Sequence, residues 1–205
     1  MVQTTSWLKL LEDYNFRQAR PVPEKTALLV IDMQNYFRVL AGPVLSNVLS
    51  LIEACRSRGI RIVFTRHGHR EPARDGGMLR TWWGDLIMFG SPEWQLMQEL
   101  DPSRGEAVID KTRYSAFFKT SLDEQLRAGR VEDLIVCGVM TNCCCETTAR
   151  SAFVRDYRVF FVADATATAN QELQLATLKN LAYGFAYIAA TEELCQHLCH
   201  LCVCD

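Results

Sequence analysis

The chain has 205 residues, a formal net charge of −2 and a hydrophobic fraction of 49%. A single domain of this size buries roughly 70% of the surface that its unfolded chain exposes, so it needs no disulfide or structural metal to fold. The near-balanced charge argues against a nucleic-acid-binding protein, which would carry a basic stripe. No apolar run reaches the roughly 18 residues that indicate a membrane span. We therefore expect neither nucleic acid nor a membrane as a partner.

The N-terminus and the nine cysteines indicate the compartment. Residues 1–20 are polar and of mixed charge, and they lack the apolar core of a secretion signal. An odd number of cysteines without such a signal is typical of reduced thiols, so we predict a cytoplasmic protein.

Apolar runs typical of buried strands alternate with helix-length segments. Strands are predicted at residues 26–32, 60–65, 107–110, 134–139, 157–163 and 185–189. Helices are predicted at residues 43–58, 92–100, 122–128, about 142–155 and 173–183. This alternation predicts an α/β fold with a six-stranded, mainly parallel sheet covered by helices on both faces. We assign residues 1–194 to this domain and residues 195–205 to a cysteine-rich tail.

Residues 68–90 form a long, glycine-rich segment without a clear pattern, and they contain Trp82 and Trp83. A loop of this length in a compact domain is usually functional or mobile. We expect it to act as a lid that brings both tryptophans to the substrate. Packing in the core or between subunits is the alternative role for these rings.

Reactive side chains follow three of the predicted strands. Asp32 ends the first strand, Lys111 follows the third, and three consecutive cysteines, residues 143–145, follow the fourth. Ligands of open parallel sheets bind outside the carboxyl ends of the strands, so these groups could form one site. There the acid could take the proton of a thiol, and the lysine would favour the thiolate.

The cysteine cluster lies where a helix is expected to begin, with Thr141 or Asn142 as its cap. Free backbone N–H groups and the positive end of the helix dipole favour a thiolate there. One of Cys143, Cys144 and Cys145 is therefore a candidate nucleophile.

Three blocks of the sequence resemble the isochorismatase-like hydrolases and occur in family order. They are residues 30–37 (VIDMQNYF), 110–117 (DKTRYSAF) and 138–150 (GVMTNCCCETTAR), and the resemblance spans about residues 25–193. This superfamily includes isochorismatases, nicotinamidases, carbamoyl-sarcosine amidases and ureidoacrylate amidases. The resemblance implies a Rossmann-like, three-layer α/β/α fold and a homo-oligomer, either a dimer or a tetramer.

The resemblance also implies roles for particular residues. Asp32 would be the general base, Lys111 its electrostatic partner and Cys144 the nucleophile, since family members usually read Thr-Asn-x-Cys before the helix. It further implies a cis peptide bond between Val139 and Met140, with the amides of Met140 and Cys144 as the oxyanion hole.

These residues predict a hydrolase that cleaves the C–N bond of a small amide or ureide through a thioester. True isochorismatases resemble the chain at residues 111–117 but hydrolyse a vinyl ether without a nucleophilic cysteine. Nicotinamidases carry an Asp-x-His metal motif downstream of the first block, and no histidine follows Asp32 there. We therefore expect no metal and no cofactor. Two alternatives stay open: a vinyl-ether hydrolase acting on isochorismate, and a non-catalytic family member that binds ligands or senses redox state.

Several side chains are candidates for the substrate pocket: Phe37, Trp82, Trp83, Arg113, Tyr114 and Phe117. The aromatic residues could line an apolar wall or pack in the core. Arg113 could bind a substrate carboxylate or pair with a nearby acid.

Two histidine-containing segments could hold a metal. His67 and His69 follow the second strand, but no third ligand accompanies them in the sequence, so hydrogen bonding to substrate or loop is the preferred interpretation. Residues 195–204 contain four cysteines and two histidines. They lack the paired knuckles of a zinc ribbon, and a frayed terminal helix is the simpler interpretation.

Overall fold

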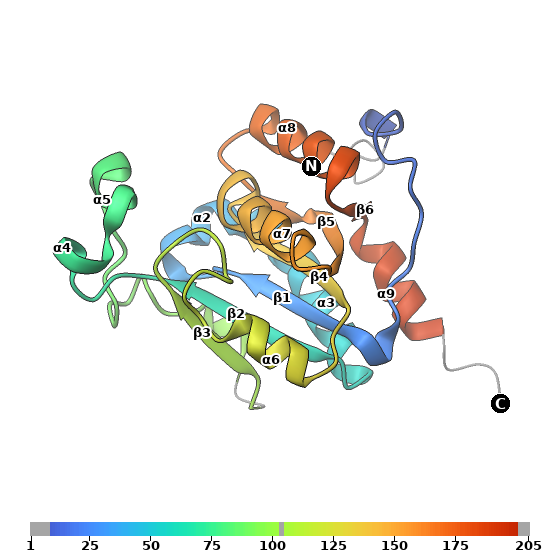
Figure 1. Ribbon diagram of the computed structural model, residues 1–205, viewed down its shortest axis with the longest axis horizontal. Helices are drawn as coiled ribbons and strands as arrows, with labels where there is room; N and C mark the ends of the chain where they lie inside the picture. Colours follow the sequence, from blue (N-terminus) through green and yellow to red (C-terminus); the bar gives the residue numbers. More distant parts are fainter. Residues whose placement is uncertain (1–8, 103–104, 201–205) are drawn as a thin grey trace.

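A computed structural model of the chain describes residues 9–102 and 105–200. Its six strands form one sheet in the order β3-β2-β1-β4-β5-β6, and every neighbouring pair is parallel (Figure 1). The strands are β1 (Thr26–Ile31), β2 (Arg61–His67), β3 (Ala107–Lys111), β4 (Asp133–Val139), β5 (Arg158–Ala167) and β6 (Tyr187–Ala189). The predicted Rossmann-like α/β fold is confirmed.

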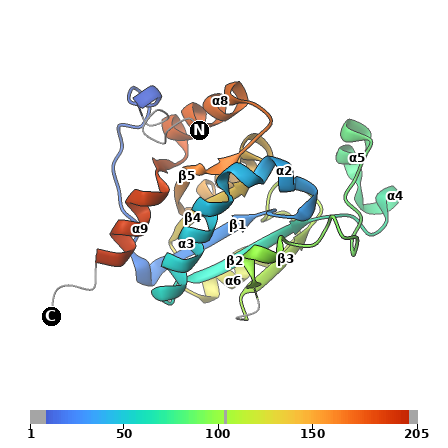
Figure 2. The ribbon, with the colours of Figure 1, turned by 180° about the vertical axis from the view of Figure 1, so that it is seen from behind.

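Helices cover both faces of the sheet and create two apolar cores. One face is covered by α6 (Leu122–Ala128), α7 (Glu146–Phe153) and α8 (Gln171–Gly184), and the other by α3 (Leu45–Ser57) and α9 (Thr191–His200) (Figure 2). Strand β1 serves both cores, since Leu29 and Ile31 face the first group of helices and Leu28 and Val30 the second. This two-sided burial explains why the strands read as continuous apolar runs.

Shorter elements connect these layers. They are η1 (Pro23–Lys25), η2 (Asn35–Phe37), α2 (Arg38–Ala41), η3 (Gly42–Val44), α4 (Pro72–Asp75), α5 (Gly77–Trp83), η4 (Gln98–Leu100) and η6 (Thr141–Cys145), the last a π-helical turn. Helices α4 and α5 project from the body of the molecule (Figure 1), within the segment whose pattern was irregular.

Two sequence expectations need correction. The helix predicted at residues 92–100 is wrong, because residues 92–94 form a turn, Leu96 forms an antiparallel bridge with Gln34, and only the short 3-10 helix η4 lies at the end of the range. The predicted boundary at residue 194 falls inside α9, where Leu194 and Leu198 are buried against the sheet. Residues 201–205 of the expected tail lie outside the described residues.

One stretch, Asn35–Ser57, is long and apolar enough to cross a membrane by length and composition alone. In the fold it is divided into η2, α2, η3 and α3, and the apolar side chains of α3 belong to the core. Core packing therefore accounts for its composition.

The strand order reverses between β1 and β4, and β1 and β4 approach closely at Gly138. Gly138 has a φ of 113°, and a Cβ atom there would lie 2.1 Å from the carbonyl oxygen of Ile31. Only glycine fits this contact, which brings the carboxyl ends of β1 and β4 together. Such a reversal is where open α/β sheets bind ligands.

Candidate active site

Three reactive side chains meet at the carboxyl ends of the strands. Asp32 follows β1, Lys111 is the last residue of β3, and Cys144 lies in η6 directly after β4. All three are buried, with 0%, 2% and 5% of their surface exposed. The Cys144 thiol interacts with both the Asp32 carboxylate and the Lys111 ammonium.

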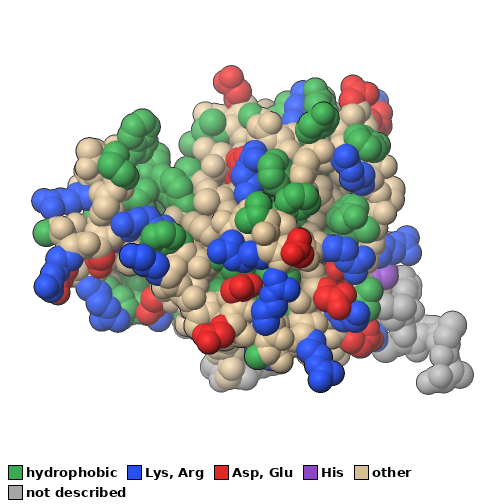
Figure 3. Space-filling view, in the orientation of Figure 1, with side chains coloured by type: hydrophobic (Ala, Val, Ile, Leu, Met, Phe, Trp, Pro, Cys, Tyr) green, Lys and Arg blue, Asp and Glu red, His purple; other side chains and the backbone are tan. Residues whose placement is uncertain are grey.

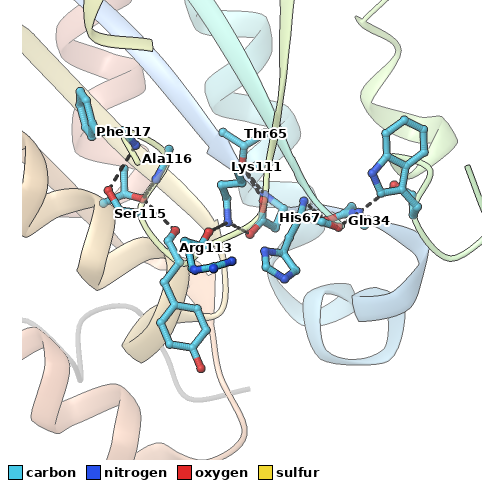
Figure 4. A network of polar contacts seen from close by, with 12 residues as sticks. Gln34, Thr65, His67, Lys111, Arg113, Ser115, Ala116 and Phe117 are labelled. Atoms are coloured by element: carbon cyan, nitrogen blue, oxygen red, sulfur yellow. Dashed lines mark hydrogen bonds and ion pairs between the residues drawn. The ribbon is translucent and has the colours of Figure 1, made fainter. Parts of the chain in front are cut away.

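Asp32 and Lys111 form a buried ion pair. The Lys111 Nζ lies 2.6 Å from Asp32 Oδ2 and donates a 3.0 Å hydrogen bond to the Arg113 carbonyl (Figure 4). Burial alone would lower the pKa of Lys111, but the neighbouring Asp32 and Cys144 outweigh it and the pKa is raised. Lys111 is therefore a fixed positive charge beside Asp32 and Cys144.

Thr65 of β2 holds Asp32 in place. Its hydroxyl donates a 2.6 Å hydrogen bond to Asp32 Oδ1 and accepts a 3.1 Å bond from the Asp32 backbone N–H. Asp32 has a φ of 48°, a left-handed conformation that is uncommon for residues other than glycine. Sequence reasoning missed Thr65, because a threonine at a strand end carries no distinguishing pattern.

Cys144 sits in a π-helical turn, a feature that often marks functional sites. The Met140 carbonyl accepts hydrogen bonds of 3.1 Å from the amides of both Cys143 and Cys145. The peptide bond between Val139 and Met140 is cis, as the resemblance implied.

The expected capping and its effect on the thiol need correction. The Thr141 hydroxyl has no partner, and the Asn142 side chain instead accepts a hydrogen bond of 2.5 Å from Thr168. Burial raises the pKa of Cys144 above its ordinary value, and the opposing effect of Lys111 is too small to reverse this. The free protein therefore holds Cys144 as a neutral thiol near pH 7.

A cavity of about 170 Å³ opens above Cys144. This is small beside the roughly 300–1,000 Å³ of sites for drug-sized ligands, so it suits a small molecule. Its lining is mainly apolar and aromatic and comprises Tyr36, Phe37, His67, Leu79, Trp83, Asp85, Leu86, Ile87, Tyr114, Met140, Cys143 and Cys144.

The six candidate pocket residues divide into two groups. Phe37, Trp83 and Tyr114 line the cavity, and Trp83 Nε1 donates a 2.7 Å hydrogen bond to the Tyr114 hydroxyl. Trp82 is 76% exposed on α5 and lies outside the lining. Figure 3 shows that apolar side chains lie at the surface of the projecting segment.

Arg113 and Phe117 also lie outside the lining. The Arg113 guanidinium donates 2.6 Å hydrogen bonds to the carbonyls of Asp75 and Thr112, so it faces backbone rather than ligand. Phe117 is buried in the core, with its ring centroid 6.0 Å from that of Tyr157.

The segment after β2 supplies wall residues that sequence reasoning missed: Leu79, Asp85, Leu86 and Ile87. Their only signal was the length of the irregular segment. Gln34 was also missed. It accepts a 2.8 Å hydrogen bond from the His67 backbone N–H and donates to the carbonyls of His67 and Trp94, which fixes the start of this segment (Figure 4).

The imidazole rings of His67 and His69 lie against each other. Their Nε2 atoms are 3.3 Å apart, and His69 Nδ1 lies 3.2 Å from Asp75 Oδ1, a carboxylate that the sequence did not indicate. Burial and the Lys111 charge lower the pKa of His67 to about 4, so it is neutral near pH 7. Of the four ring nitrogens of these two histidines, His67 Nδ1 is the one without a hydrogen-bond partner.

This arrangement does not fit a nicotinamidase-type metal. A metal site needs three or more ligands, and His67 and His69 supply only two imidazoles. Within residues 9–102 and 105–200, no group of three or more His, Cys, Asp or Glu residues is placed to hold a metal ion.

Comparison with known proteins identifies the family of the chain. The sequence model of the isochorismatase domain matches residues 26–193. Nicotinamidase 3 from Arabidopsis thaliana is 48% identical over 184 residues, which cover 88% of this chain and 92% of that protein. Ureidoacrylate amidohydrolase RutB from Serratia proteamaculans (strain 568) is 31% identical over 207 residues, covering 86% and 84%. A solved cysteine hydrolase from Pseudomonas syringae pv. phaseolicola 1448A superposes with a TM-score of 0.84 at 28% identity, covering 88% of this chain and 95% of that chain.

Proposed function

Because the chain belongs to the isochorismatase family, we propose that it is a cysteine hydrolase that cleaves the C–N bond of a small carboxamide through a thioester on Cys144. One observation carries this proposal: a buried Asp32–Lys111 ion pair lies against the Cys144 thiol, which lines an apolar cavity. Such a base, cation and thiol are the parts that nucleophilic catalysis needs.

Acylation begins with proton transfer from the Cys144 thiol to Asp32. The resulting thiolate attacks the carbonyl carbon of the substrate, and a C–S bond forms while negative charge moves to the carbonyl oxygen. The backbone N–H groups of Met140 and Cys144 are our candidates to stabilise this oxyanion. The tetrahedral intermediate then collapses, the C–N bond breaks, and the proton on Asp32 passes to the leaving nitrogen, which departs as ammonia.

Deacylation reverses the proton's route. Asp32 takes a proton from a water molecule, whose oxygen attacks the thioester carbonyl. The C–S bond breaks, Cys144 regains its proton from Asp32, and the carboxylic acid leaves. Lys111 keeps its charge throughout and stabilises negative charge wherever it resides among these groups.

The cavity supports a substrate that carries no negative charge. Its described lining includes one formally charged side chain, Asp85, which is an acid, and His67 is neutral near pH 7. A substrate carboxylate, such as those of isochorismate and ureidoacrylate, would find no cationic partner in this lining. A flat carboxamide fits between the aromatic walls, and the 48% identity to a protein named nicotinamidase makes nicotinamide the first compound to test.

A substrate panel with a cysteine variant tests the proposal. Wild type and Cys144→Ala would be assayed with nicotinamide, ureidoacrylate and isochorismate, with Cys199→Ala, an exposed thiol on α9, as the control. We expect turnover of nicotinamide by wild type and the control, and its loss in Cys144→Ala.

Other outcomes would contradict the proposal. Turnover of isochorismate that survives in Cys144→Ala would indicate vinyl-ether hydrolysis with Asp32 alone. No turnover of any amide or vinyl ether would favour a binding or redox-sensing protein.

A further inference from the structure

The walls of the cavity have the chemical character of a cation site. Four aromatic side chains line it, Tyr36, Phe37, Trp83 and Tyr114, together with Asp85. Aromatic faces carry negative electrostatic potential and attract cations, most strongly where several rings surround one position. A carboxylate beside such rings adds to the same preference.

These groups are arranged by depth. Cys144 is 5% exposed at the bottom of the cavity, whereas Tyr36 and Trp83 are 47% and 54% exposed at its mouth. Asp85 is also exposed, and its Oδ2 lies 3.4 Å from the Tyr36 hydroxyl. We infer that a carboxamide whose reactive end reaches Cys144 has the far edge of its ring beside Tyr36, Trp83 and Asp85.

The aromatic walls are held in position before any ligand enters. Trp83 donates its indole N–H to Tyr114 at 2.7 Å, which joins α5 to the loop after β3. Tyr36 and Phe37 pack edge to face, with ring centroids 4.9 Å apart and an interplanar angle of 84°. A ligand would pay little ordering entropy to use these rings.

Three arginines near the cavity, Arg66, Arg70 and Arg113, have partners of their own. The Arg113 guanidinium donates to two backbone carbonyls. Arg66 pairs with Asp110 and lies over the Trp94 ring, and Arg70 lies over the Phe89 ring. The Lys111 ammonium is matched by Asp32 beneath the cavity.

We propose that this cavity prefers carboxamides whose ring carries a positive charge at the edge facing the mouth, and that Asp85 is the residue that sets this preference. The simplest such ligand is an N-alkylated pyridinium carboxamide. This inference deepens the proposed function, because it depends on the carboxamide end lying at Cys144.

A matched ligand pair isolates the effect of charge. The cation 1-methylnicotinamide and the neutral 3-methylbenzamide have the same shape and differ in one ring atom. Their dissociation constants would be measured by isothermal titration calorimetry on the full chain carrying Cys144→Ala, which retains the cavity but cannot form a thioester. We expect the cation to bind about tenfold more tightly.

Variants in the same background identify the cause. Asp85→Asn should reduce the preference to about threefold or less, since the rings remain and the carboxylate is gone. The control is Asp13→Asn, the same chemical change at an exposed position. Asp13 is close in sequence to Asn15, which bonds to Ile188 of β6, the edge strand opposite β3. It should leave the ratio unchanged, and melting curves would verify that both variants fold.

Equal affinity for the two ligands would overturn the inference, as would a preference that Asp85→Asn leaves intact. The outcome is separable from that of the proposed function. A cation preference without Cys144-dependent turnover of nicotinamide would remove the proposed function and leave this binding preference. Cys144-dependent turnover with equal affinities would remove the preference alone.

Discussion

Replacing Thr65 with valine should show how strongly its hydroxyl holds Asp32. Valine keeps the shape of the side chain, but it removes both the 2.6 Å bond to Asp32 Oδ1 and the 3.1 Å bond from the Asp32 N–H. A hydrogen bond to a charged group contributes about 1.5–3 kcal/mol, and a buried N–H left without a partner costs about 1–3 kcal/mol. Because one hydroxyl makes both bonds, we expect a loss of roughly 3 kcal/mol in the free energy of unfolding, or about 6–12 °C in Tm.

Equilibrium urea unfolding would measure this loss, with Thr65→Ser as the matched control. Serine retains the hydroxyl and gives up one buried methyl group, about 1 kcal/mol. On nicotinamide, Thr65→Val should also lower kcat, since an untethered Asp32 accepts the thiol proton less efficiently. The reasoning is refuted if Thr65→Val is as stable as Thr65→Ser, since the hydroxyl would then contribute nothing to the position of Asp32.

Three further outcomes follow from the site and the core. Because burial raises the pKa of Cys144, iodoacetamide labelling of this thiol, measured by mass spectrometry, should be slow at pH 7 and faster at each more alkaline pH, and Lys111→Met should slow it further. A labelling rate that levels off below pH 8 would contradict this. Trp83→Ala should lower kcat/KM about tenfold or more, because it removes part of the cavity wall and the hydrogen bond to Tyr114, whereas Trp82→Ala should leave kcat/KM unchanged. Equal effects of the two substitutions would show that α5 acts in another way. Leu198→Ala should lower the free energy of unfolding by about 2–5 kcal/mol, measured with urea, because Leu198 is fully buried between α9 and the sheet. A change under about 1 kcal/mol would mean that α9 is dispensable.

The strands were predictable because their chemistry is local. A central parallel strand is buried on both faces, so β1 and β4 read as unbroken apolar runs, and their predicted limits fall within a residue of those observed. Strand β5 extends four residues beyond its predicted end. Beyond that end the strand continues through the polar Asp164, where its register with β4 shifts. A polar residue is not typical of a buried strand, so nothing in the sequence indicated that β5 continues.

The site was predictable only where residue type and position coincide. Asp32, Lys111 and the cysteines at residues 143–145 were candidates because each is reactive and each follows a strand, and the family resemblance selected Cys144 among the three. Arg113 was offered for a substrate carboxylate because its type suggests it, yet the fold turns its guanidinium toward carbonyls of Asp75 and Thr112. The direction of a long side chain depends on tertiary contacts, and no local pattern records it.

The sign of the Cys144 pKa shift illustrates the same limit. The start of a helix and a nearby lysine both favour a thiolate, and the sequence shows both features. Burial of the thiol opposes them, and its cost for a charged group in a low dielectric is the larger effect at this position. How deeply the cysteine is buried depends on the packing of η6 between strands and helices, which the sequence did not reveal.

A neutral resting thiol is compatible with the proposed mechanism because of where the negative charge lies. In the free protein the charge is on Asp32, 2.6 Å from Lys111. Proton transfer from Cys144 to Asp32 moves the negative charge to the sulfur, which also interacts with Lys111. Attack on the substrate carbonyl then moves this charge to the carbonyl oxygen, beside the π-helical turn that holds Cys144. The buried site thus holds one negative and one positive charge at every stage, and no step adds a new charge to the interior. An isolated thiolate would have to overcome its full desolvation cost, whereas here the cost of burying one ion pair is met once, when the protein folds.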